Sequence, residues 1–489
     1  MRHRSKPPAL RHVVSINDLT NKEIELIFEE AQYYLKNFGD PAYPYRIARS
    51  TDLAANCILA TLFYEPSTRT RLSFESAMAR LGGKSITSAD PRTSSAAKGE
   101  TIADSVRVIS NYADIIVMRH PRDGAARLAA EYSSIPVING GDGSHEHPTQ
   151  TLCDLFTLKQ KNKSFTDLTV AISGDLKGSR TIHSFVYALA RFGANIALSP
   201  AAGMGLPANV DTRLREEFGR QRADYVGNDT SIDAWYIGPE QPHQLSLIPS
   251  ADLVDPDLRT RQKIEKIAQT IHFMYVTRFQ KERRSGEQKQ NYPKVDAKFL
   301  GAPQYSKTSV LHPLPRVDEL DVSFDSDRRA LYFEQAAYGV PVRMALIGFL
   351  LGLRSRSLQR FEGGFPRPDN AVYEHPIGMG ISCGNENCIV NDEHERRQAK
   401  NRFYLVSPTP AHTPKLRCMY CESDIEEAEG QPLVVAQKSK GTFSFGLSQL
   451  QKIPHERMKD FLIFASEADA AAQGFRRKER PTRNYLSAG

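Results

Sequence analysis

Short apolar segments recur along the N-terminal part of the chain, and helix-compatible segments separate them. The apolar segments are CILATLF, DIIVMR, IPVING, LTVAISG, NIALSP, HFMYVTRF and TSVLHPL. Most are followed by a segment with helical spacing, such as SFESAMARL after Thr70 or ALARFG after Thr181. A helical period also runs through residues 17–38. Strands that alternate with helices predict α/β domains built on parallel sheets.

The same pattern divides the chain into two α/β domains, a linker and two C-terminal segments. The expected bounds are 1–150 and 151–340 for the α/β domains, with an apolar helix at 341–355 completing the first, 354–372 for the linker, 373–430 for a cysteine-bearing segment and 431–489 for an extension. The linker is rich in Arg, Gly and Pro. The pattern assigns no role to the extension, whose basic end GFRRKERPTR is expected to be a solvated tail.

Composition limits the classes of function. The 489 residues are 40% hydrophobic and 25% charged, which is enough for packed cores. A formal net charge of +7 is small for this length, so binding to nucleic acid or to a membrane is not expected. No apolar run approaches the ~20 residues of a membrane span, and the basic N-terminus lacks the apolar region of a signal peptide. Six cysteines do not indicate a disulfide scaffold here, so we expect a cytoplasmic protein.

The stretch Ser67-Thr68-Arg69-Thr70-Arg71 places many hydrogen-bond donors at an expected strand-to-helix junction. A loop that enters a helix offers free backbone N–H groups and the positive end of the helix dipole, which together attract anions. Hydroxyl groups and a planar guanidinium match a phosphate better than a carboxylate. The alternative is an N-cap followed by surface arginines. The stretch is not a P-loop, because Met78 stands where that motif needs a glycine ahead of Gly83-Lys84-Ser85.

Three further polar groups follow expected strands. They are Met118-Arg119-His120-Pro121, His147-Pro148-Thr149-Gln150 and His312-Pro313-Leu314-Pro315. A single histidine in such a place is more often structural than functional. The carboxyl ends of parallel strands are nevertheless where α/β proteins bind their ligands, so the groups together indicate one site.

These motifs carry a resemblance to a known family. The chain is similar to aspartate carbamoyltransferase catalytic chains over about residues 10–355, in STRTR with FES, SSAAKGET, MRHP, HPTQTL, GDLKGSRTIHS, TRFQKER and HPLPRVDE. The resemblance implies two doubly wound α/β domains with the active site between them. The first domain would bind carbamoyl phosphate and the second aspartate. The implied reaction gives N-carbamoyl-L-aspartate and phosphate in de novo pyrimidine biosynthesis.

The resemblance also implies a carbamoyl phosphate site. The phosphate would be bound by Ser67, Thr68, Arg69 and Thr70. Arg119 would reach the phosphate and the carbonyl oxygen, and His147 would hydrogen-bond the carbonyl oxygen. The carbamoyl NH2 would donate to Gln150 and to the backbone carbonyls of Pro313 and Leu314.

For aspartate, the resemblance implies a pair of arginine clamps. Arg180 and Arg278 would bind the two carboxylates, with Gln280 beside them. Ser94 and Lys98 match a loop that the family inserts into the site of a neighbouring subunit. We therefore expect a homotrimer with shared active sites.

The chemistry implied is attack of the aspartate amine on the carbamoyl carbon. The catalytic residues would be Arg69, Thr70, Lys98, Arg119 and His147. Thr70, Arg119 and His147 would hold the developing oxyanion, and positioning of two small anions would supply much of the rate. The leaving phosphate can accept the amine proton, so no protein general base, catalytic metal or organic cofactor is expected.

Two alternatives stay open. An ornithine-type or other carbamoyltransferase would need acidic groups to meet an ammonium group, whereas Arg278 stands in TRFQKER. Ornithine enzymes also use a cysteine in the HCLP motif, and this chain has His312-Pro313-Leu314-Pro315. A catalytically silent scaffold of the same fold is the other alternative, although every motif residue needed for the chemistry is present.

Four cysteines in the C-terminal part form two close pairs, Cys383-x4-Cys388 and Cys418-x2-Cys421. Four thiolates so spaced predict tetrahedral structural zinc. Unrelated buried cysteines and a nucleic-acid zinc ribbon are the alternatives, but no basic face is obvious. The segment resembles the zinc domain of the aspartate carbamoyltransferase regulatory chain, which implies further assembly of trimers. The linker at 354–372 is too short for the nucleotide-binding domain of that chain, so control by nucleotides is not expected.

Overall fold

The chain folds into two units in the computed structural model. The N-terminal unit is Met1–Pro366 and the C-terminal unit is Arg367–Gly489. The structure describes residues 10–88, 98–162, 164–166, 168–201, 203–216, 234–241, 244–248, 271–280, 294–353, 372–375, 380–406, 415–425, 433–447, 450, 453 and 455–478. Ser94, most of the expected linker (354–371) and the tail at 479–489 lie outside these residues.

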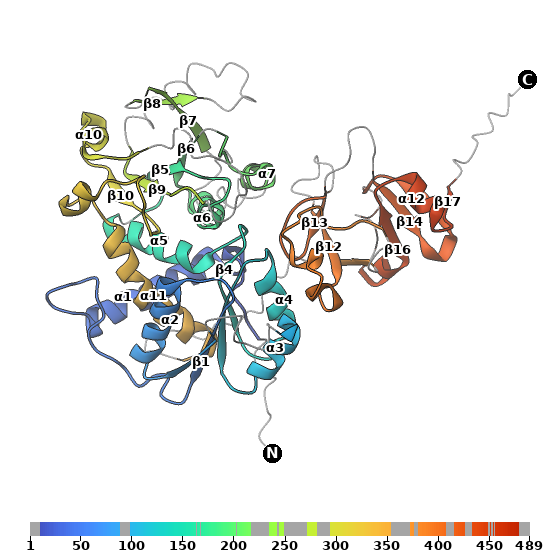
Figure 1. Cartoon of the computed structure of the whole chain (residues 1–489), viewed down its shortest axis with the longest axis horizontal. Helices are drawn as coiled ribbons and strands as arrows, with labels where there is room; N and C mark the ends of the chain where they lie inside the picture. The colour runs from blue at the N-terminus through green and yellow to red at the C-terminus, as the bar shows by residue number, and fades with distance from the viewer. Residues whose placement is uncertain are drawn as a thin grey trace, which may run out of the picture. The chain divides into compact units, whose positions relative to one another are not determined.

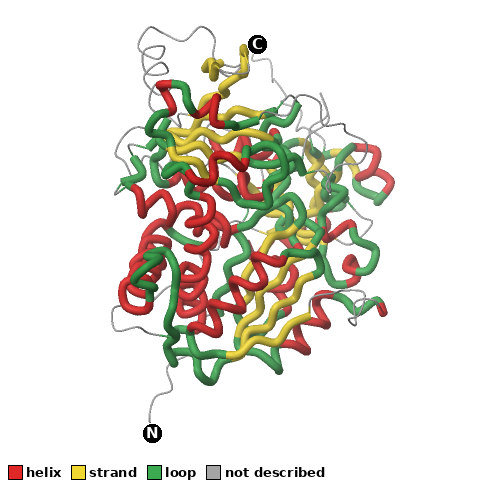
Figure 2. Tube along the Cα trace, turned by 60° about the vertical axis from the view of Figure 1, so that its left-hand side comes forward, coloured by secondary structure: helices red, strands yellow, loops and turns green. Residues whose placement is uncertain are grey.

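The first sheet of the N-terminal unit has four parallel strands in the order β2-β1-β3-β4 (Figure 1). Their bounds are Ile58–Phe63 for β1, Lys84–Ser88 for β2, Ile115–His120 for β3 and Val137–Asp142 for β4. The helices between them are α2, Thr68–Arg80, α3, Ile102–Ile109, and α4, Ala125–Tyr132. Figure 2 shows helices, in red, on both sides of these strands. Because β1 and β3 are buried along most of their length, they appear in the sequence as unbroken apolar runs.

The second sheet has six strands in the order β10-β9-β5-β6-β7-β8. Their bounds are Thr169–Gly174 for β5, Asn195–Pro200 for β6, Ala234–Gln241 for β7, Gln244–Ile248 for β8, Phe273–Val276 for β9 and Ser309–Leu311 for β10. Strands β10, β9, β5, β6 and β7 pair in parallel, whereas β8 pairs antiparallel with β7. Two residues separate β7 from β8, which is too few for a parallel crossover. The α/β prediction is confirmed, with one antiparallel edge strand that it did not include.

Helix α11, Tyr332–Leu351, connects the end of the second half to the first. It packs against α1, Asn21–Phe38, against α2, and against α5, Pro148–Lys161. The helix begins at Tyr332 rather than at residue 341, because its first turns contain polar residues that interrupt the apolar pattern. It ends at Gly352, whose φ of 64° suits a glycine. Among the described residues no helix is long and apolar enough to cross a membrane.

A continuous apolar core holds the two sheets and their helices together. It includes Leu59 of β1, Ile172 of β5, Phe185 of α6 (Arg180–Arg191) and Leu346 of α11, all fully buried. A second cluster of buried apolar residues lies on the six-stranded sheet and includes Met274 of β9. The segments that follow the strands are therefore anchored to one packed interior, which limits how far their side chains can move.

The C-terminal unit contains two small sheets. The first is antiparallel, in the order β11-β12-β13, with bounds Val372–His375, Asn401–Val406 and Lys415–Cys418. The second has the order β16-β14-β15-β17, with bounds Phe461–Phe464, Val434–Gln437, Thr442–Phe445 and Arg476–Arg477, and α12, Glu467–Ala472, packs on it. The N–H of Ile381 donates to the carbonyl of Ile463 at 2.9 Å and joins the cysteine-bearing segment to the second sheet. Much of the extension is thus folded, and Arg476 and Arg477, expected in a tail, form a strand.

Candidate active site and metal centre

The segment between β1 and α2 carries the hydroxyl and guanidinium groups of the STRTR motif. Ser67 is the N-cap of α2, so Thr68, Arg69 and Thr70 form the first turn of the helix. That turn has no acidic residue, and the N–H groups and dipole of a helix start favour an anion. Thr70 is buried, whereas Arg69 is exposed. The helix begins earlier than its apolar spacing indicates, and this places Arg69 where an anion would bind.

Arg119, at the end of β3, lies against the two glycines of β4. Its Nη1 donates to the carbonyl of Gly140 at 3.2 Å, and its Nη2 donates to Oε1 of Glu65 at 2.9 Å. Gly141 has a φ of +111°, and a Cβ there would lie 3.0 Å from Nη1 of Arg119 and 2.9 Å from the guanidinium carbon of Arg180. Gly141 therefore lets two guanidinium groups approach bare backbone, which a residue with a side chain would not.

Glu65 connects the first sheet to the second. Its Oε2 accepts from Nη1 of Arg180 at 2.9 Å, and its Oε1 accepts from Nη2 of Arg180 at 3.0 Å as well as from Arg119. Arg180 is the first residue of α6, is 2% exposed, and also donates to the carbonyl of Gly143 at 2.8 Å. The sequence interpretation did not single out Glu65, although it lies just ahead of the STRTR motif. The sequence did contain a signal for it: an acidic residue next to an expected anion site is unfavourable unless it pairs with arginines.

Arg278 and Gln280 follow β9, and Asp175 holds this segment beside the loop ahead of α6. Oδ2 of Asp175 accepts from the N–H of Gln280 at 3.1 Å, and Oδ1 accepts from the N–H of Gly178 at 2.8 Å. Nε2 of Gln280 donates to the carbonyl of Arg278 at 3.3 Å. The fully buried Asp175 thus brings the GDLKGSRTIHS and TRFQKER motifs together. It was also missed from the sequence, because these two partners are backbone groups.

His147 and Gln150 stand at the start of α5. His147 is the buried N-cap, and its N–H donates to Oγ of Ser184 in α6 at 2.9 Å. Gln150 lies in the first turn, and its Nε2 donates to Oδ1 of Asp154 at 2.7 Å. The start of this helix is therefore held by side chains both from its own next turn and from the second half of the unit.

The segment after β10 contains the HPLP motif. Nδ1 of His312 accepts from the N–H of Leu314 at 2.8 Å, so the ring proton lies on Nε2, which donates to Oε1 of Glu319 at 2.8 Å. Burial lowers the pKa of His312 despite the opposing effect of Glu319, so the imidazole is neutral at physiological pH. His312 therefore shapes the loop that presents the backbone of Pro313 and Leu314.

The positive charges of the motifs lie close enough to affect one another. Partial desolvation, and after it the charge of Arg278, lower the pKa of Arg69. The charge of Arg69 in turn adds to the burial that lowers the pKa of His312. Like charges brought together are unfavourable until an anion lies between them. The arrangement is thus suited to anionic ligands, and it unites the segments after β1, β9 and β10.

Two expected residues are not joined to this group. Lys98 lies ahead of α3 with an exposed side chain, and the described residues show no contact between it and the arginines above. Ser94 lies outside the described residues.

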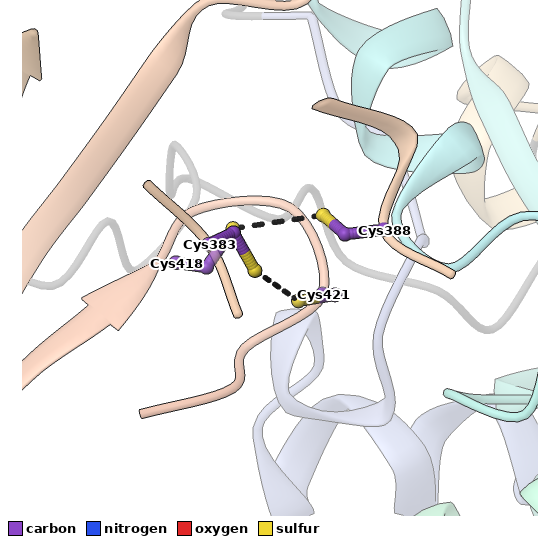
Figure 3. Close-up of side chains that lie close together, drawn as sticks. All are labelled: Cys383, Cys388, Cys418 and Cys421. Carbon is purple, nitrogen blue, oxygen red and sulfur yellow. Dashed lines mark hydrogen bonds between the residues drawn. The ribbon is translucent and has the colours of Figure 1, made fainter. Parts of the chain in front are cut away.

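The four C-terminal cysteines form a buried cluster in which their side chains point toward one another (Figure 3). All four Sγ atoms lie within 4.8 Å of one another, with Cys383 and Cys421 at 3.4 Å and Cys388 and Cys418 at 3.8 Å. Sulfur ligands of a tetrahedral zinc lie about 3.8 Å apart, because the Zn–S bond is about 2.3 Å. The donor set and its spacing therefore fit a metal of this kind.

Comparison with known families assigns both units. Residues 11–160 match the model of the aspartate/ornithine carbamoyltransferase, carbamoyl-P binding domain, and residues 248–350 match that of the Asp/Orn binding domain. Residues 376–430 match the metal binding domain of the aspartate carbamoyltransferase regulatory chain. The segment that carries the four cysteines is therefore of the regulatory-chain type.

Individual relatives agree with the first two of these matches. The aspartate carbamoyltransferase catalytic subunit of Archaeoglobus fulgidus is 41% identical over 343 residues, which cover 69% of this chain and 98% of the relative. That of Thermoplasma volcanium is 42% identical over 347 residues, with 70% and 98% covered. The solved catalytic subunit from M. jannaschii aligns with a TM-score of 0.54 at 38% identity, covering 70% of this chain and 98% of that one. Aspartate transcarbamoylase from Trypanosoma cruzi, solved with carbamoyl phosphate and aspartate, aligns with a TM-score of 0.53 at 29% identity, covering 70% of this chain and 98% of that one. This chain therefore belongs to the aspartate carbamoyltransferase family and carries, on the same polypeptide, a metal binding domain of the regulatory-chain type.

Proposed function

We propose that the protein transfers the carbamoyl group of carbamoyl phosphate to the amine of L-aspartate, giving N-carbamoyl-L-aspartate and phosphate in pyrimidine biosynthesis. The observation that carries this proposal is that arginines from four separate motifs gather in two close pairs, Arg119 with Arg180 on Glu65 and Arg69 near Arg278. Two substrates that are both anions need such a set, because their charges must be bound at the same time. The catalytic subunits that resemble this chain along nearly their whole length support the same reaction.

The carbamoyl phosphate would lie against the first turn of α2. Ser67, Thr68, Arg69 and Thr70 would bind its phosphate. Arg119 would bind the phosphate and the carbonyl oxygen, and His147 would donate to the same carbonyl oxygen. The carbamoyl NH2 would donate to Gln150 and to the carbonyls of Pro313 and Leu314. These donors and acceptors would hold the carbonyl carbon open to attack.

Aspartate would lie on the side of the second sheet. Arg180 and Arg278 would bind its two carboxylates, with Gln280 beside them. The deprotonated amine would attack the carbamoyl carbon, and the oxyanion would be stabilised by Thr70, Arg119 and His147. The phosphate leaves as the C–O bond breaks and can take the amine proton, so the atoms balance without a protein nucleophile.

Acceptor choice tests the reaction directly. The purified chain, given carbamoyl phosphate, should carbamoylate aspartate and not ornithine, because Arg278 would pair with the side-chain carboxylate and repel an ammonium group. The measurement is colorimetric detection of the two carbamoylated products at equal acceptor concentrations. Ornithine turnover at comparable efficiency would overturn the assignment, and no turnover of either acceptor would favour the silent scaffold.

The exposed position of Lys98 supports a site shared between subunits of a homotrimer, with Ser94 and Lys98 supplied by a neighbour. Arg69→Ala and Lys98→Ala should each be nearly inactive alone. Mixed trimers should recover activity, because some of their sites contain neither substitution. If confirmed subunit exchange restores nothing, each site is built from one chain.

For the C-terminal unit we propose a structural zinc held by Cys383, Cys388, Cys418 and Cys421. The support is the closed set of four thiols, which leaves no coordination position for a substrate. The bound metal would supply folding free energy to the small unit, and the unit would join trimers into a larger assembly. Metal analysis together with the molar mass of the intact chain tests both parts of this proposal.

A further inference from the structure

A fully buried carboxylate, Asp154, lies behind the carbamoyl phosphate residues, in the second turn of α5. Its Oδ1 accepts from Nε2 of Gln150 at 2.7 Å and from Nε2 of Gln335 at 2.6 Å. Its Oδ2 accepts from the hydroxyl of Tyr275 at 2.9 Å. The three donors are neutral side chains from α5, α11 and β9, so one carboxylate connects both halves of the unit.

The contact with Asp154 decides which end of the Gln150 amide is presented to the site. An ionised carboxylate only accepts hydrogen bonds, so it can face the NH2 end of an amide but not the oxygen end. Burial raises the pKa of Asp154 to about 6, against the opposing effect of its hydrogen bonds, so the group is ionised at pH 8. Oε1 of Gln150 is consequently turned away from Asp154 and is left to accept a hydrogen bond from elsewhere.

The same logic applies to Gln335 and reaches the HPLP loop. Because Nε2 of Gln335 faces Asp154, its Oε1 faces the other way and accepts from the N–H of His312 at 2.9 Å. His312 then accepts from the N–H of Leu314 at 2.8 Å. The orientation of the Pro313–Leu314 backbone is therefore fixed through three successive hydrogen bonds that start at Asp154.

We propose that Asp154 is a positioning residue that makes the site selective for an NH2 group on the transferred carbonyl carbon, by orienting both sets of acceptors for that group. The inference rests on the proposed function, in which Gln150 and the carbonyls of Pro313 and Leu314 accept from the carbamoyl NH2. With Asp154 absent, the Gln150 amide can turn and present its own NH2, so that a donor meets a donor. The loss falls on carbamoyl phosphate and spares acyl phosphates that have a methyl group in place of the NH2.

The test uses the full chain and two ligands, carbamoyl phosphate as substrate and acetyl phosphate as competitive inhibitor. Acetyl phosphate keeps the phosphate and the carbonyl but lacks the NH2. In Asp154→Ala, kcat/KM for carbamoyl phosphate should fall about tenfold to a hundredfold, because one or two hydrogen bonds lose their orientation. The inhibition constant of acetyl phosphate should stay within about twofold, as for changes that leave the bound groups in place. Equal losses for the two ligands, or no loss for carbamoyl phosphate, would overturn the proposal.

Three further variants separate orientation from folding. Asp154→Asn should restore most of the selectivity, because its oxygen can accept from both glutamines while its NH2 donates to the oxygen of Tyr275. Tyr275→Phe removes the third hydrogen bond to Asp154, together with the contact of the same hydroxyl with Thr181, but leaves both glutamines in place, so it should keep the selectivity of the unchanged chain. If Asp154→Ala does not fold, Gln335→Leu removes only the hydrogen bonds that lead from Asp154 to His312. It should lower kcat/KM for carbamoyl phosphate by a smaller factor and leave the inhibition constant of acetyl phosphate unchanged.

The two proposals fail in different ways. If the unchanged chain forms no carbamoyl aspartate, the proposed function is wrong, and the variants have no activity to compare. The unchanged chain can instead be active while Asp154→Ala binds carbamoyl phosphate and acetyl phosphate more weakly by the same factor. In that case the proposed function stands and Asp154 has only a structural role. Gln335→Leu is judged in the same way if it has to replace Asp154→Ala.

Discussion

The two units of this chain reach stability by different means. The N-terminal unit has a large continuous apolar core that extends through both sheets and the helices packed on them, and a second cluster on the six-stranded sheet. The C-terminal unit has a small cluster of buried apolar residues on its second sheet, and beside it four cysteines that fit a metal. Small units bury too little apolar surface to be stable on that basis alone, and a bound metal can supply the missing folding free energy.

This difference also governs where charge can gather. The N-terminal unit holds Arg119 and Arg180 on the carboxylate of Glu65, and it holds Arg69 near Arg278, a pair of like charges that is unfavourable without an anion. A large core tolerates this cost, because the segments that carry the arginines are anchored in it. In the C-terminal unit the four cysteines form the corresponding group, and a bound metal would offset the negative charge of their thiolates. The comparison predicts that the two units respond differently to the same kind of damage.

Removal of the metal ligands should have the largest effect. Structural zinc contributes about 10–16 kcal/mol to the folding of small zinc peptides, so Cys418→Ser with Cys421→Ser should unfold the cysteine-bearing segment. Bound zinc and any assembly beyond the trimer should be lost, while carbamoyl transfer persists. Elemental analysis, light scattering and activity on the same samples check this, with Cys57→Ser in the other unit as control. A double variant that keeps its mass but loses all activity would contradict it.

A matched pair of core truncations should separate the units next. Leu462→Ala, in the small sheet, and Leu346→Ala, in α11, each remove a buried leucine and should each cost about 2–5 kcal/mol. The small unit has little stability to lose, so the first should become susceptible to protease at 25 °C while the second stays folded. Limited proteolysis followed by mass spectrometry measures this. Equal resistance of the two variants would show that the C-terminal unit does not depend on its small core.

Loss of Arg69 should remove activity and leave both units folded. Arg69 is exposed in the first turn of α2, so Arg69→Ala should lower kcat by about 10²–10³ without a change in melting temperature. Arg80→Ala, at the other end of the same helix, is the control and should stay close to the activity of the unchanged chain. Steady-state kinetics and thermal unfolding are the measurements. A large fall in melting temperature for Arg69→Ala would mean that the residue is structural.

Replacing Glu65 by glutamine should have the smallest effect of the four. Glu65→Gln keeps the size of the side chain but weakens the pairing with Arg119 and Arg180, and one hydrogen bond to a charged group contributes about 1.5–3 kcal/mol. We expect kcat/KM for aspartate to fall about tenfold to a hundredfold, with zinc content unchanged. Glu75→Gln, in α2, is the matched control. Unchanged kinetics would mean that the two arginines are held well enough by their backbone partners.

The apolar pattern predicted β1, β3, β5, β6 and β9, and the edge strands β4 and β10, because most of their residues are buried. It missed β2, whose residues Lys84–Ser88 are mostly exposed at the sheet edge, and it also missed β7 and the antiparallel β8. Motif residues could be named because local stretches carry them. Glu65, Asp154 and Asp175 could not, since their functional meaning comes from partners far away in the chain, such as Arg180 for Glu65 and Gln335 for Asp154. Local sequence therefore names the residues that are expected to contact a ligand and leaves out the carboxylates that hydrogen-bond to them.

The hydrogen bond between Ile381 and Ile463 has a consequence for the order in which the chain can fold during its synthesis. A nascent chain that has reached residue 430 already contains all four cysteines, but it does not yet contain the strand that receives the N–H of Ile381. Metal capture can therefore precede the closing of the second sheet, while the apolar Ile381 remains uncovered. Domains generally fold as they leave the ribosome, and uncovered apolar segments are prone to aggregate in that interval. Strand β16 thus completes the packing of a segment whose metal ligands were made before it.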